Sequence, residues 1–555
     1  MEALAQKEQT VEDREAGDAV ESECYPSSVL PHSSRLFLDY VESSAPLAPF
    51  YSHVATGKAW MRQGRPLTPE HRSQLADLLT EQNRRFGGGA ITDTSIDRLR
   101  NGASAVVTGQ QVALFGGPLY TLLKAATAIA RAREATAAGI ETVPVFWLAS
   151  EDHDFAEVAT IHLPAQTPHE TALKTITIGP PPQVPVPVGG IPLGPGVKGA
   201  LDEVEALLGA DTTALLRETY PAGDATMAEA FGSLMARLFA PWGLIVMDAA
   251  GAPFHQLGAP VLEQAIRDAD ALHAALVARD RELAARGYHS QVLVGEQSSL
   301  LFLIDEATGA RLPLRRSEGR WKAGSRRCTS EELLHVLEVS PERLSPNALL
   351  RPVFQDAILP TSAYVAGPAE IAYFAQSNVV FSAILGRETA VLPRLSATLV
   401  NPRLATVMAR FQVRFPDALT TPDTLAQRLG ARSLPIEGKR RLASAGNALD
   451  EELTALTGWM AQMDAGLGRS AETAASKMRY QMNRLRRLAA RHQLEKESSL
   501  ARHAAAITGA IYPDGHLQER VVAGIAFLAS HGEGLLEHLV EAARDACPGH
   551  KMLLL

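Results

Sequence analysis

Residues 105–124 read AVVTGQQVALFGGPLYTLLK, and residues 143–158 read VPVFWLASEDHDFAEV. In each stretch a short apolar run ends abruptly at polar residues. A strand buried on both faces is continuously apolar, and the ligands of open parallel sheets bind beyond the carboxyl ends of such strands. We therefore expect residues 108–111 and 150–154 to lie side by side at one edge of a parallel sheet. The active site is predicted at this edge.

The segment joining the two stretches predicts a strand–helix–strand unit. Its strands are residues 105–108 and 143–149, and its helix begins near Pro118. Gly139 ends the helix, as glycine commonly does in the left-handed conformation. Because such a crossover is right-handed, the two strands are parallel. Further short strands are expected at residues 244–248, 353–356 and 361–365, with a helix opening at residues 367–374.

The flanking sequence predicts helices before this unit and antiparallel structure after it. Thr68 is expected to cap a helix whose first residue is Pro69. Residues 290–322 alternate between apolar and polar side chains, which is typical of an antiparallel insertion. Residues 163–199 are rich in proline and glycine and predict extended edge structure or a linker.

The pattern beyond residue 391 predicts an antiparallel coiled-coil hairpin. Apolar residues recur at spacings of three, four and seven, as in a heptad seam. The predicted seam is Leu442, Leu449, Leu453, Leu456, Met460, Met463 and Leu467. A second long helix follows a glycine-containing turn at residues 466–470.

These patterns predict an α/β protein with four regions. They are a disordered acidic tail (1–24), a parallel-sheet catalytic core (25–395) with insertions at about 160–225 and 290–345, a coiled-coil domain (396–510) with helices at about 439–465 and 470–508, and a C-terminal segment (511–555) that packs back on the core.

The composition is that of a soluble, cytoplasmic, multidomain protein. The chain has 555 residues, 46% of them hydrophobic, and a formal net charge of −9. This charge argues against general binding to nucleic acid or to acidic membranes. No apolar run approaches the ~20 residues needed to span a bilayer, and the start of the chain is not a secretion signal. The three cysteines, Cys24, Cys328 and Cys547, are so far apart that we expect neither a disulfide framework nor a metal site.

The first candidate site is the turn that follows the first strand. Gly116 and Gly117 precede a predicted helix, where free N–H groups attract phosphate or carboxylate. The spacing matches neither a dinucleotide fingerprint nor a P-loop, so a tight packing turn is the alternative. The adjacent amides of Gln110 and Gln111 need polar partners, and substrate atoms are natural ones.

The second candidate site is the densest ionisable cluster in the chain, Glu151, Asp152, His153 and Asp154. Such a cluster supplies a general base, orients a nucleophile or ligates a metal. The structural alternative is that Asp152 or Asp154 caps the next helix and His153 bonds to a backbone carbonyl.

Several blocks of the sequence resemble one known family. Residues 108–124 and 144–158 are similar to the two signature blocks of the BshC family, the cysteine-adding enzymes of bacillithiol biosynthesis. The similarity extends to residues 366–374, to the hairpin and to residues 513–520, and so covers nearly everything after Tyr25. Two features depart from the family pattern: Ala113 stands where glycine is expected, and the acidic N-terminus is an extension.

The resemblance implies a Rossmann-like core with connecting-peptide insertions, as in class I aminoacyl-tRNA synthetases, and a homodimer built by the coiled coil. It implies a cysteine ligase that adds L-cysteine to the amine of glucosaminyl malate in the last step of bacillithiol biosynthesis. On this basis we expect no metal and no firm cofactor, with ATP or ADP as candidate nucleotides. The predicted catalytic residues are Glu151, Asp152, His153 and Asp154. The predicted substrate-binding residues are Thr108, Gln110, Gln111, Gly116, Gly117, Tyr120, Glu370 and Tyr373.

Two other functions compete with this one. A metal-dependent hydrolase would use the cluster at residues 151–154. A scaffold built on the coiled coil would not explain why two core strands end in polar clusters.

Overall fold

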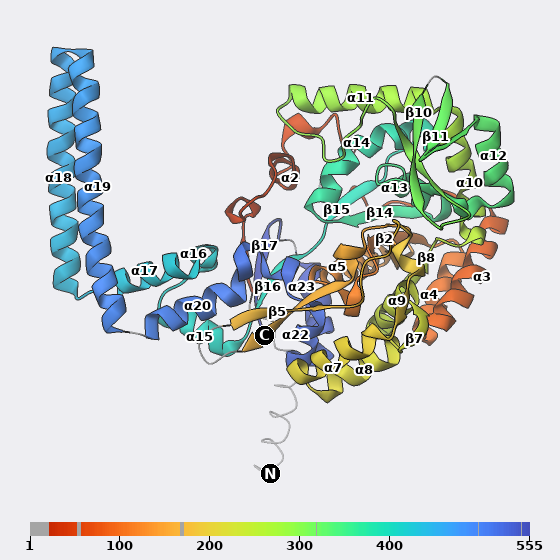
Figure 1. Cartoon of the computed structure of the whole chain (residues 1–555), viewed down its shortest axis with the longest axis horizontal. Coiled ribbons are helices and arrows are strands. Elements are labelled where there is room, and N and C mark those ends of the chain that lie inside the picture. The colour runs from red at the N-terminus through yellow and green to blue at the C-terminus, as the bar shows by residue number, and fades with distance from the viewer. Residues whose placement is uncertain (1–21, 53–56, 167–170, 318, 498, 546) are drawn as a thin grey trace, which may run out of the picture. The chain divides into compact units, whose positions relative to one another are not determined.

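The computed structural model describes residues 22–52, 57–166, 171–317, 319–497, 499–545 and 547–555 (Figure 1). These residues form two compact units. Unit 1 contains the described residues of Met1–Pro164, Leu173–Thr398 and Glu519–Leu553, and unit 2 contains those of Ala165–Ala172, Leu399–Gln518 and Leu554–Leu555. Within the described part of the chain, no helix is long and apolar enough to cross a membrane.

Unit 1 is built around a parallel sheet of five strands. From edge to edge the order is β15 (Ala390–Pro393), β14 (Thr361–Ala366), β2 (Ser104–Gln110), β3 (Thr142–Leu148) and β8 (Ile245–Asp248). Every neighbouring pair is parallel. The chain runs outward from β2 through β3 to β8 and then returns to the other side of β2. This is the order of a Rossmann-like sheet, which confirms the predicted fold class.

The order of the strands reverses between β2 and β14. In sheets of this kind the ligand crevice lies at that point, beyond the carboxyl ends of the strands. Gln110 is beside Leu148 in the register, and Leu148 is beside Asp248. The polar residues that follow β2, β3, β8 and β14 therefore share one edge, and the predicted placement of residues 108–111 beside 150–154 is confirmed.

Both faces of the sheet are buried by helices, which explains the continuous apolar strands. Val107, Val145 and Met247 belong to the large cluster that α3 (Pro69–Phe86) and α13 (Arg351–Ile358) complete. On the other face Val106 packs with α5 (Tyr120–Ala137), and Phe146 contacts Phe231 of α9 (Met227–Phe239).

The predicted start of α3 is confirmed. The Thr68 hydroxyl accepts a hydrogen bond from the His71 N–H, and Pro69 is the first residue of α3. The remaining helices of eight residues or more in unit 1 are α4 (Ala90–Arg100), α7 (Gly196–Leu208), α8 (Ala210–Thr219), α10 (Ala252–Arg267), α11 (Ala269–Ala285), α12 (Ser330–Val339), α14 (Pro368–Leu385), α22 (Gly524–His531) and α23 (Gly534–Arg544).

The strand predicted at residues 353–356 is wrong, because these residues lie in α13. Pro352 occupies one of its first two positions, which suits the start of a helix. Val353, Phe354, Ala357 and Ile358 recur at helical spacing, and all are buried. The run was short enough to fit either periodicity.

An antiparallel sheet confirms the insertion predicted at residues 290–322. Its order is β12 (Arg326–Cys328), β11 (Arg320–Ala323), β10 (Arg311–Ser317), β9 (Ser298–Ile304) and β13 (Leu344–Pro346). Two small antiparallel pairs lie in the region rich in proline and glycine, namely β4 (Thr160–Gln166) with β5 (Thr171–Thr177), and β6 (Pro192–Gly194) with β7 (Gly223–Thr226).

Unit 2 is helical and contains the predicted hairpin. Its helices are α15 (Pro402–Arg410), α16 (Phe415–Ala418), α17 (Pro422–Arg432), α18 (Ile436–Met463), α19 (Ala465–Lys496) and α20 (Ser499–Ile511). The second long helix starts five residues earlier than predicted, because the Asp464 carboxylate caps it by accepting hydrogen bonds from the N–H groups of Gly466 and Leu467. Of the predicted seam, Leu453 is buried, whereas Leu456, Met463 and Leu467 are exposed.

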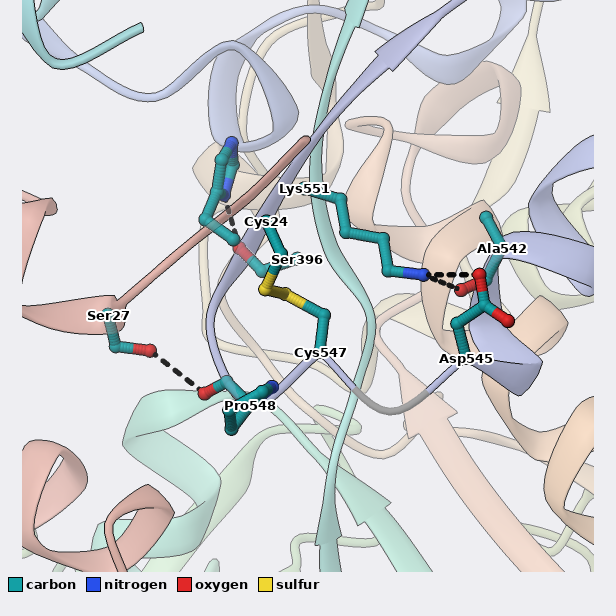
Figure 2. Close-up of a disulfide and its surroundings, with 9 residues drawn as sticks. Cys24, Ser27, Ser396, Ala542, Asp545, Cys547, Pro548 and Lys551 are labelled. Carbon is teal, nitrogen blue, oxygen red and sulfur yellow. Dashed lines mark hydrogen bonds and ion pairs between the residues drawn. A yellow bond between two sulfur atoms is a disulfide. The ribbon is translucent and has the colours of Figure 1, made fainter. Parts of the chain in front are cut away.

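The two ends of the described chain meet in a third sheet, of order β1 (Ser22–Tyr25), β17 (His550–Leu554) and β16 (Ser396–Val400). Residues 22–24 therefore belong to a strand and not to the predicted tail, whose residues 1–21 lie outside the described part of the chain. Cys24 and Cys547 form a disulfide (Figure 2). The expectation of no disulfide was wrong, because a separation of 523 residues hides the contact in the sequence.

Candidate active site

Three pockets open at the carboxyl edge of the parallel sheet. The cationic pocket has a volume of about 390 Å³ and contains Lys124, Arg351, Arg394 and Arg520. The histidine pocket, of about 360 Å³, contains Glu151, Asp152, His153 and Arg311. The acidic pocket, of about 590 Å³, contains Glu151, Glu218, Glu229, Asp248 and Glu342. Asp152 and Arg351 line both of the first two pockets, and Glu151 lines the last two.

An ion pair between two helices forms the floor of the cationic pocket. Lys124 on α5 lies 2.6 Å from Glu370 on α14, and both side chains are largely buried. Burial lowers the pKa of the Lys124 ammonium, and Glu370 partly offsets this effect. Burial also acts to raise the pKa of Glu370, but Lys124 and the Gly367 N–H outweigh it, so that pKa is lowered. The carboxylate therefore stays ionised, and it joins the helices that follow β2 and β14.

Unlike Lys124 and Arg394, Arg351 has no carboxylate within ion-pair distance among the described residues. Its guanidinium donates a hydrogen bond of 2.9 Å to the Tyr373 hydroxyl. Arg394 is instead neutralised by a bidentate pair with Glu519, at 2.6 and 3.0 Å. Arg520 is exposed and likewise forms no ion pair within the described residues. Two guanidinium groups thus remain available for an anionic ligand.

The two glutamines predicted from the sequence both line the cationic pocket. Gln110 accepts a hydrogen bond from Lys124 and donates one of 3.2 Å to the Tyr120 hydroxyl. Burial raises the pKa of Tyr120 to about 12, so this phenol is a neutral hydrogen-bonding group. The amide of Gln111 donates to both Asp152 and Glu157, at 2.9 Å each.

Asp152 is held as a carboxylate at the junction of two pockets. Burial acts to raise its pKa, but hydrogen bonds from the Gln111 amide and the His153 N–H outweigh burial, so the pKa is lowered. A carboxylate with a lowered pKa is a weak base, and its main effect is to orient and neutralise its neighbours.

His153 is positioned by Arg311. The guanidinium lies 3.1 Å from Nδ1, and a guanidinium only donates hydrogen bonds. Nδ1 is therefore the acceptor, and the neutral ring carries its proton on Nε2. Arg311 itself is buried and fixed by Ser345, by the Pro346 carbonyl and by the ring of Phe302. In this arrangement His153 offers a hydrogen-bond donor, and the prediction that it is the base loses support.

Glu151 differs from Asp152 and Asp154 in its hydrogen bonding. Its Oε1 atom is buried and forms no hydrogen bond in the described structure, although Nε2 of His255 lies 3.2 Å away. His255 is completely buried on α10 and packs against Phe354. Glu151 therefore lines two pockets, and its buried Oε1 atom lies beside His255.

Four of the predicted site residues have structural contacts instead. Thr108 is buried and donates to the Val365 carbonyl in the sheet. The N–H groups of Gly116 and Gly117 donate to the carbonyls of Ala113 and Leu114, so this turn does not offer them to an anion. Asp154 caps α6 (Phe155–Val158) by accepting from the Glu157 N–H, as the structural alternative proposed. We leave these four residues out of the site described below.

Several site residues were missed by sequence reasoning. They are Lys124, Arg311, Arg351, Arg394 and Arg520. Lys124 ends the quoted block and had a signal, because a lysine on an otherwise apolar stretch of helix needs a partner. The four arginines lie in segments that only the fold brings to the sheet edge, so no local pattern marked them.

The donor set does not suit the metal-dependent hydrolase alternative. In the described part of the chain, no group of three or more His, Cys, Asp and Glu side chains is arranged to hold a metal ion. Of the charged residues that follow Glu151, Asp152 accepts a hydrogen bond from the Gln111 amide and His153 bonds to Arg311.

Comparisons with known proteins agree with this fold. Residues 23–395 match the model of the bacillithiol biosynthesis BshC N-terminal Rossmann-like domain, and residues 397–555 match that of the BshC C-terminal coiled-coil domain. The chain is 41% identical to "Putative cysteine ligase BshC" of Koribacter versatilis over 96% of this chain and 99% of that protein. Proteins of the same name from Solibacter usitatus and Salinibacter ruber are 35% and 31% identical, over 96% and 95% of this chain and 99% and 97% of theirs. The protein therefore belongs to the BshC family of bacillithiol biosynthesis.

Proposed function

We propose that this protein is a cysteine ligase that joins the carboxyl group of L-cysteine to the amine of glucosaminyl malate, the last step of bacillithiol biosynthesis. The names of its relatives support a ligase acting on cysteine. The observation that carries the proposal is a pocket with two guanidinium groups outside any ion pair of the described residues, which adjoins, through Asp152, the pocket that Glu151 lines.

The cationic pocket suits the malate part of the substrate. Malate has two carboxylates, and Arg351 and Arg520 are two cations without ion-pair partners among the described residues. Arginine binds carboxylates through two parallel N–H groups, which gives orientation as well as affinity. Gln110 and the hydroxyls of Tyr120 and Tyr373 supply further polar contacts for the sugar.

In this proposal Glu151 is the general base. The amine attacks the carbonyl carbon of cysteine, a carbon–nitrogen bond forms, and the nitrogen must lose a proton. Glu151 lines both the histidine and the acidic pockets, and its carboxylate takes that proton. The Nε2–H group of His153 donates to the carbonyl oxygen as negative charge develops there. Preorganised donors of this kind typically lower the activation barrier by ~2.7–4 kcal/mol.

The carboxyl group of cysteine needs activation before an amine displaces an oxygen from it. ATP is a candidate source of that activation, and the displaced oxygen would then leave on the phosphate or AMP that is released. No step in the assignment of Glu151, His153, Arg351 or Arg520 depends on which activator is used. We also propose that the protein is a cytoplasmic homodimer that associates through the exposed apolar residues of α18 and α19.

The test is an assay with purified protein, L-cysteine and glucosaminyl malate, with and without ATP, in which thiol products are labelled and identified by mass spectrometry. We expect a product with the mass of bacillithiol, absent when glucosamine replaces glucosaminyl malate. Equal turnover of glucosamine would contradict the malate assignment. A product that contains no amide-linked cysteine would contradict the ligase itself.

A further inference from the structure

The disulfide that joins the two ends of the described chain is open to solvent. Cys24 is exposed, Cys547 is half-buried, and their Cα atoms are 6.0 Å apart (Figure 2). Cys24 lies on the edge strand β1, whose four residues pair antiparallel with β17. Small molecules that are able to react with a disulfide therefore reach this bond without unfolding the protein.

Two further contacts lie beside the pairing of β1 with β17. The Ser27 hydroxyl donates to the Pro548 carbonyl at 3.4 Å, and the backbones meet closely at Gly549, where a Cβ atom would lie 1.8 Å from the Tyr25 carbonyl oxygen. A four-residue edge strand with mostly exposed side chains buries little apolar surface. The covalent bond therefore adds a restraint to the backbone pairing that keeps β1 against β17.

A continuous chain of hydrogen bonds leads from β17 to the cationic pocket. His550, on β17, is completely buried, and its Nδ1 lies 2.8 Å from the Ser396 hydroxyl. That hydroxyl contacts the Glu519 carboxylate at 3.2 Å, and Glu519 holds Arg394 in its bidentate pair. Arg394 lies over the ring of Tyr120, 5.6 Å from its centre, and both line the pocket.

A second contact ties the same strand to the helix that carries Lys124. The buried Lys551 ammonium donates to the Ala542 carbonyl at 2.7 Å and lies 3.3 Å from Asp545 (Figure 2). Ala542 is near the end of α23, and α23 packs along α5, where Arg131 donates to the Ala543 carbonyl at 2.5 Å. The disulfide-linked segment thus supports two walls of the pocket.

We propose that the Cys24–Cys547 disulfide is a thiol-exchange site through which low-molecular-weight thiols loosen the wall of the cationic pocket. A thiolate attacks Sγ of the exposed residue Cys24, a new sulfur–sulfur bond forms, and the old one breaks. The electron pair leaves with Sγ of Cys547, which takes up a proton. A second thiolate then releases Cys24 as a thiol and forms the symmetrical small disulfide. Two small thiols are oxidised and one protein disulfide is reduced.

The chemistry of the compartment favours exchange over a permanent cross-link. In a reducing cytoplasm, disulfides are usually transient or redox-sensing, and exposed ones are the labile ones. The third cysteine, Cys328, is buried in the core and does not take part. One part of the inference rests on the proposed function: the product of the enzyme is itself a low-molecular-weight thiol. As this product accumulates, it would exchange with the Cys24–Cys547 disulfide.

Peptide mapping tests the exchange without any measurement of turnover. Protein purified without reductant is alkylated, digested and analysed by mass spectrometry before and after native incubation with millimolar L-cysteine. We expect a Cys24–Cys547 cross-linked peptide at the start, and afterwards a cysteinyl adduct on Cys24 together with free Cys547. Two alkylated thiols at the start, or a cross-link that survives incubation, would overturn the proposal.

Hydrogen exchange tests the link to the pocket. On reduction, amide exchange in residues 394–398 and 550–554 should become about tenfold faster or more, because the strand that supports them is released. The Cys24→Ser/Cys547→Ser variant should show the fast rate with or without thiol, and Cys328→Ala should respond like the natural protein. Equal rates in oxidised and reduced protein would refute the link. A failed ligase assay would leave both results unaffected, so the two proposals are separable.

Discussion

The guanidinium of Arg311 lies 3.1 Å from Nδ1 of His153, which makes this ring nitrogen an acceptor. The neutral ring then carries its proton on Nε2, where it faces the histidine pocket as a donor. A histidine held in this tautomer is poorly suited to remove a proton from a substrate amine. We therefore assign the general base to Glu151.

Replacing His153 distinguishes a donor from a base. His153→Gln keeps an N–H donor, so we expect kcat to fall by no more than about tenfold, whereas His153→Ala should lose the ~10²–10³-fold typical of a missing oxyanion donor. Steady-state kinetics of both variants check this. If His153→Gln were as inactive as His153→Ala, the donor role would be refuted.

Replacing Glu151 tests the assigned base. Glu151→Gln preserves shape and removes the proton acceptor, so kcat should fall ~10²–10⁴-fold, with little change in KM. Asp154→Asn is the matched control, because Asp154 only caps α6, and an asparagine caps a helix as well as an aspartate. The control should retain nearly full activity. A loss of kcat in the control equal to that of Glu151→Gln would show that the effect is not specific to the base.

The ion pair of Lys124 with Glu370 should be essential for stability as well as for the site. Lys124→Met leaves a buried carboxylate without its cation, which typically costs ~3–5 kcal/mol, so the unfolding temperature should drop clearly. Adding Glu370→Gln should recover part of the loss.

The exposed ion pair of Arg217 with Asp202 provides the control for this comparison. Arg217→Met should leave the unfolding temperature unchanged, because solvent screens exposed pairs. Differential scanning calorimetry measures all three variants. If Lys124→Met unfolded at the same temperature as Arg217→Met, the structural role of the buried pair would be wrong.

The core of the fold was predictable because its signals are local. Strands buried on both faces are continuously apolar, and Thr68 with Pro69 marks a helix start through contacts within one turn. The strand predicted over residues 353–356 failed for the same reason, since Val353 and Phe354 fit a short strand as well as a buried helix.

The candidate site was predictable only in part. Gln110 ends β2, and Tyr120 and Glu370 lie in the first turns of the helices that follow β2 and β14, so all three reach one pocket at the shared edge. Arg351 and Arg394 come from segments that reach this edge only after the chain has returned across the sheet. Whether Gly116 offers its N–H to a ligand depends on the loop conformation, which no residue pattern reveals.

Burial of His550 should make unit 1 less stable in acid. Desolvation lowers its pKa from 6.5 to about 4. The unfolded chain therefore binds this proton first, and the stability that the neutral ring contributes above pH 6.5 is lost as the pH falls toward 4. Between pH 6.5 and 5 the loss is ~2 kcal/mol, at 1.36 kcal/mol for each pH unit.

A variant without the ring isolates this effect from other titrating groups. His550→Asn should be less stable than the natural protein at pH 7.5, and the gap should shrink as the pH is lowered to 5. Calorimetry at several pH values gives the comparison. A gap that is constant or grows in acid would mean that the ring is not held neutral.

The exposed apolar residues of the hairpin predict self-association. Leu456, Trp459 and Met463 on α18 and Leu485 and Leu488 on α19 are each 48–61% exposed. Light scattering after size exclusion should give the mass of a dimer for the natural protein and of a monomer for Trp459→Glu/Met463→Glu. Val339→Glu, at another exposed apolar residue, should remain dimeric. A natural protein that is monomeric at micromolar concentration would contradict the proposed dimer.

The most direct test of the proposed activity is complementation of a bacterium whose own BshC has been deleted. Low-molecular-weight thiols are labelled in extracts and quantified by mass spectrometry. The account predicts that the natural chain restores bacillithiol, while Glu151→Gln, present at the same level, restores less than a hundredth of it. Full restoration by Glu151→Gln, or none by a soluble natural chain, would contradict it.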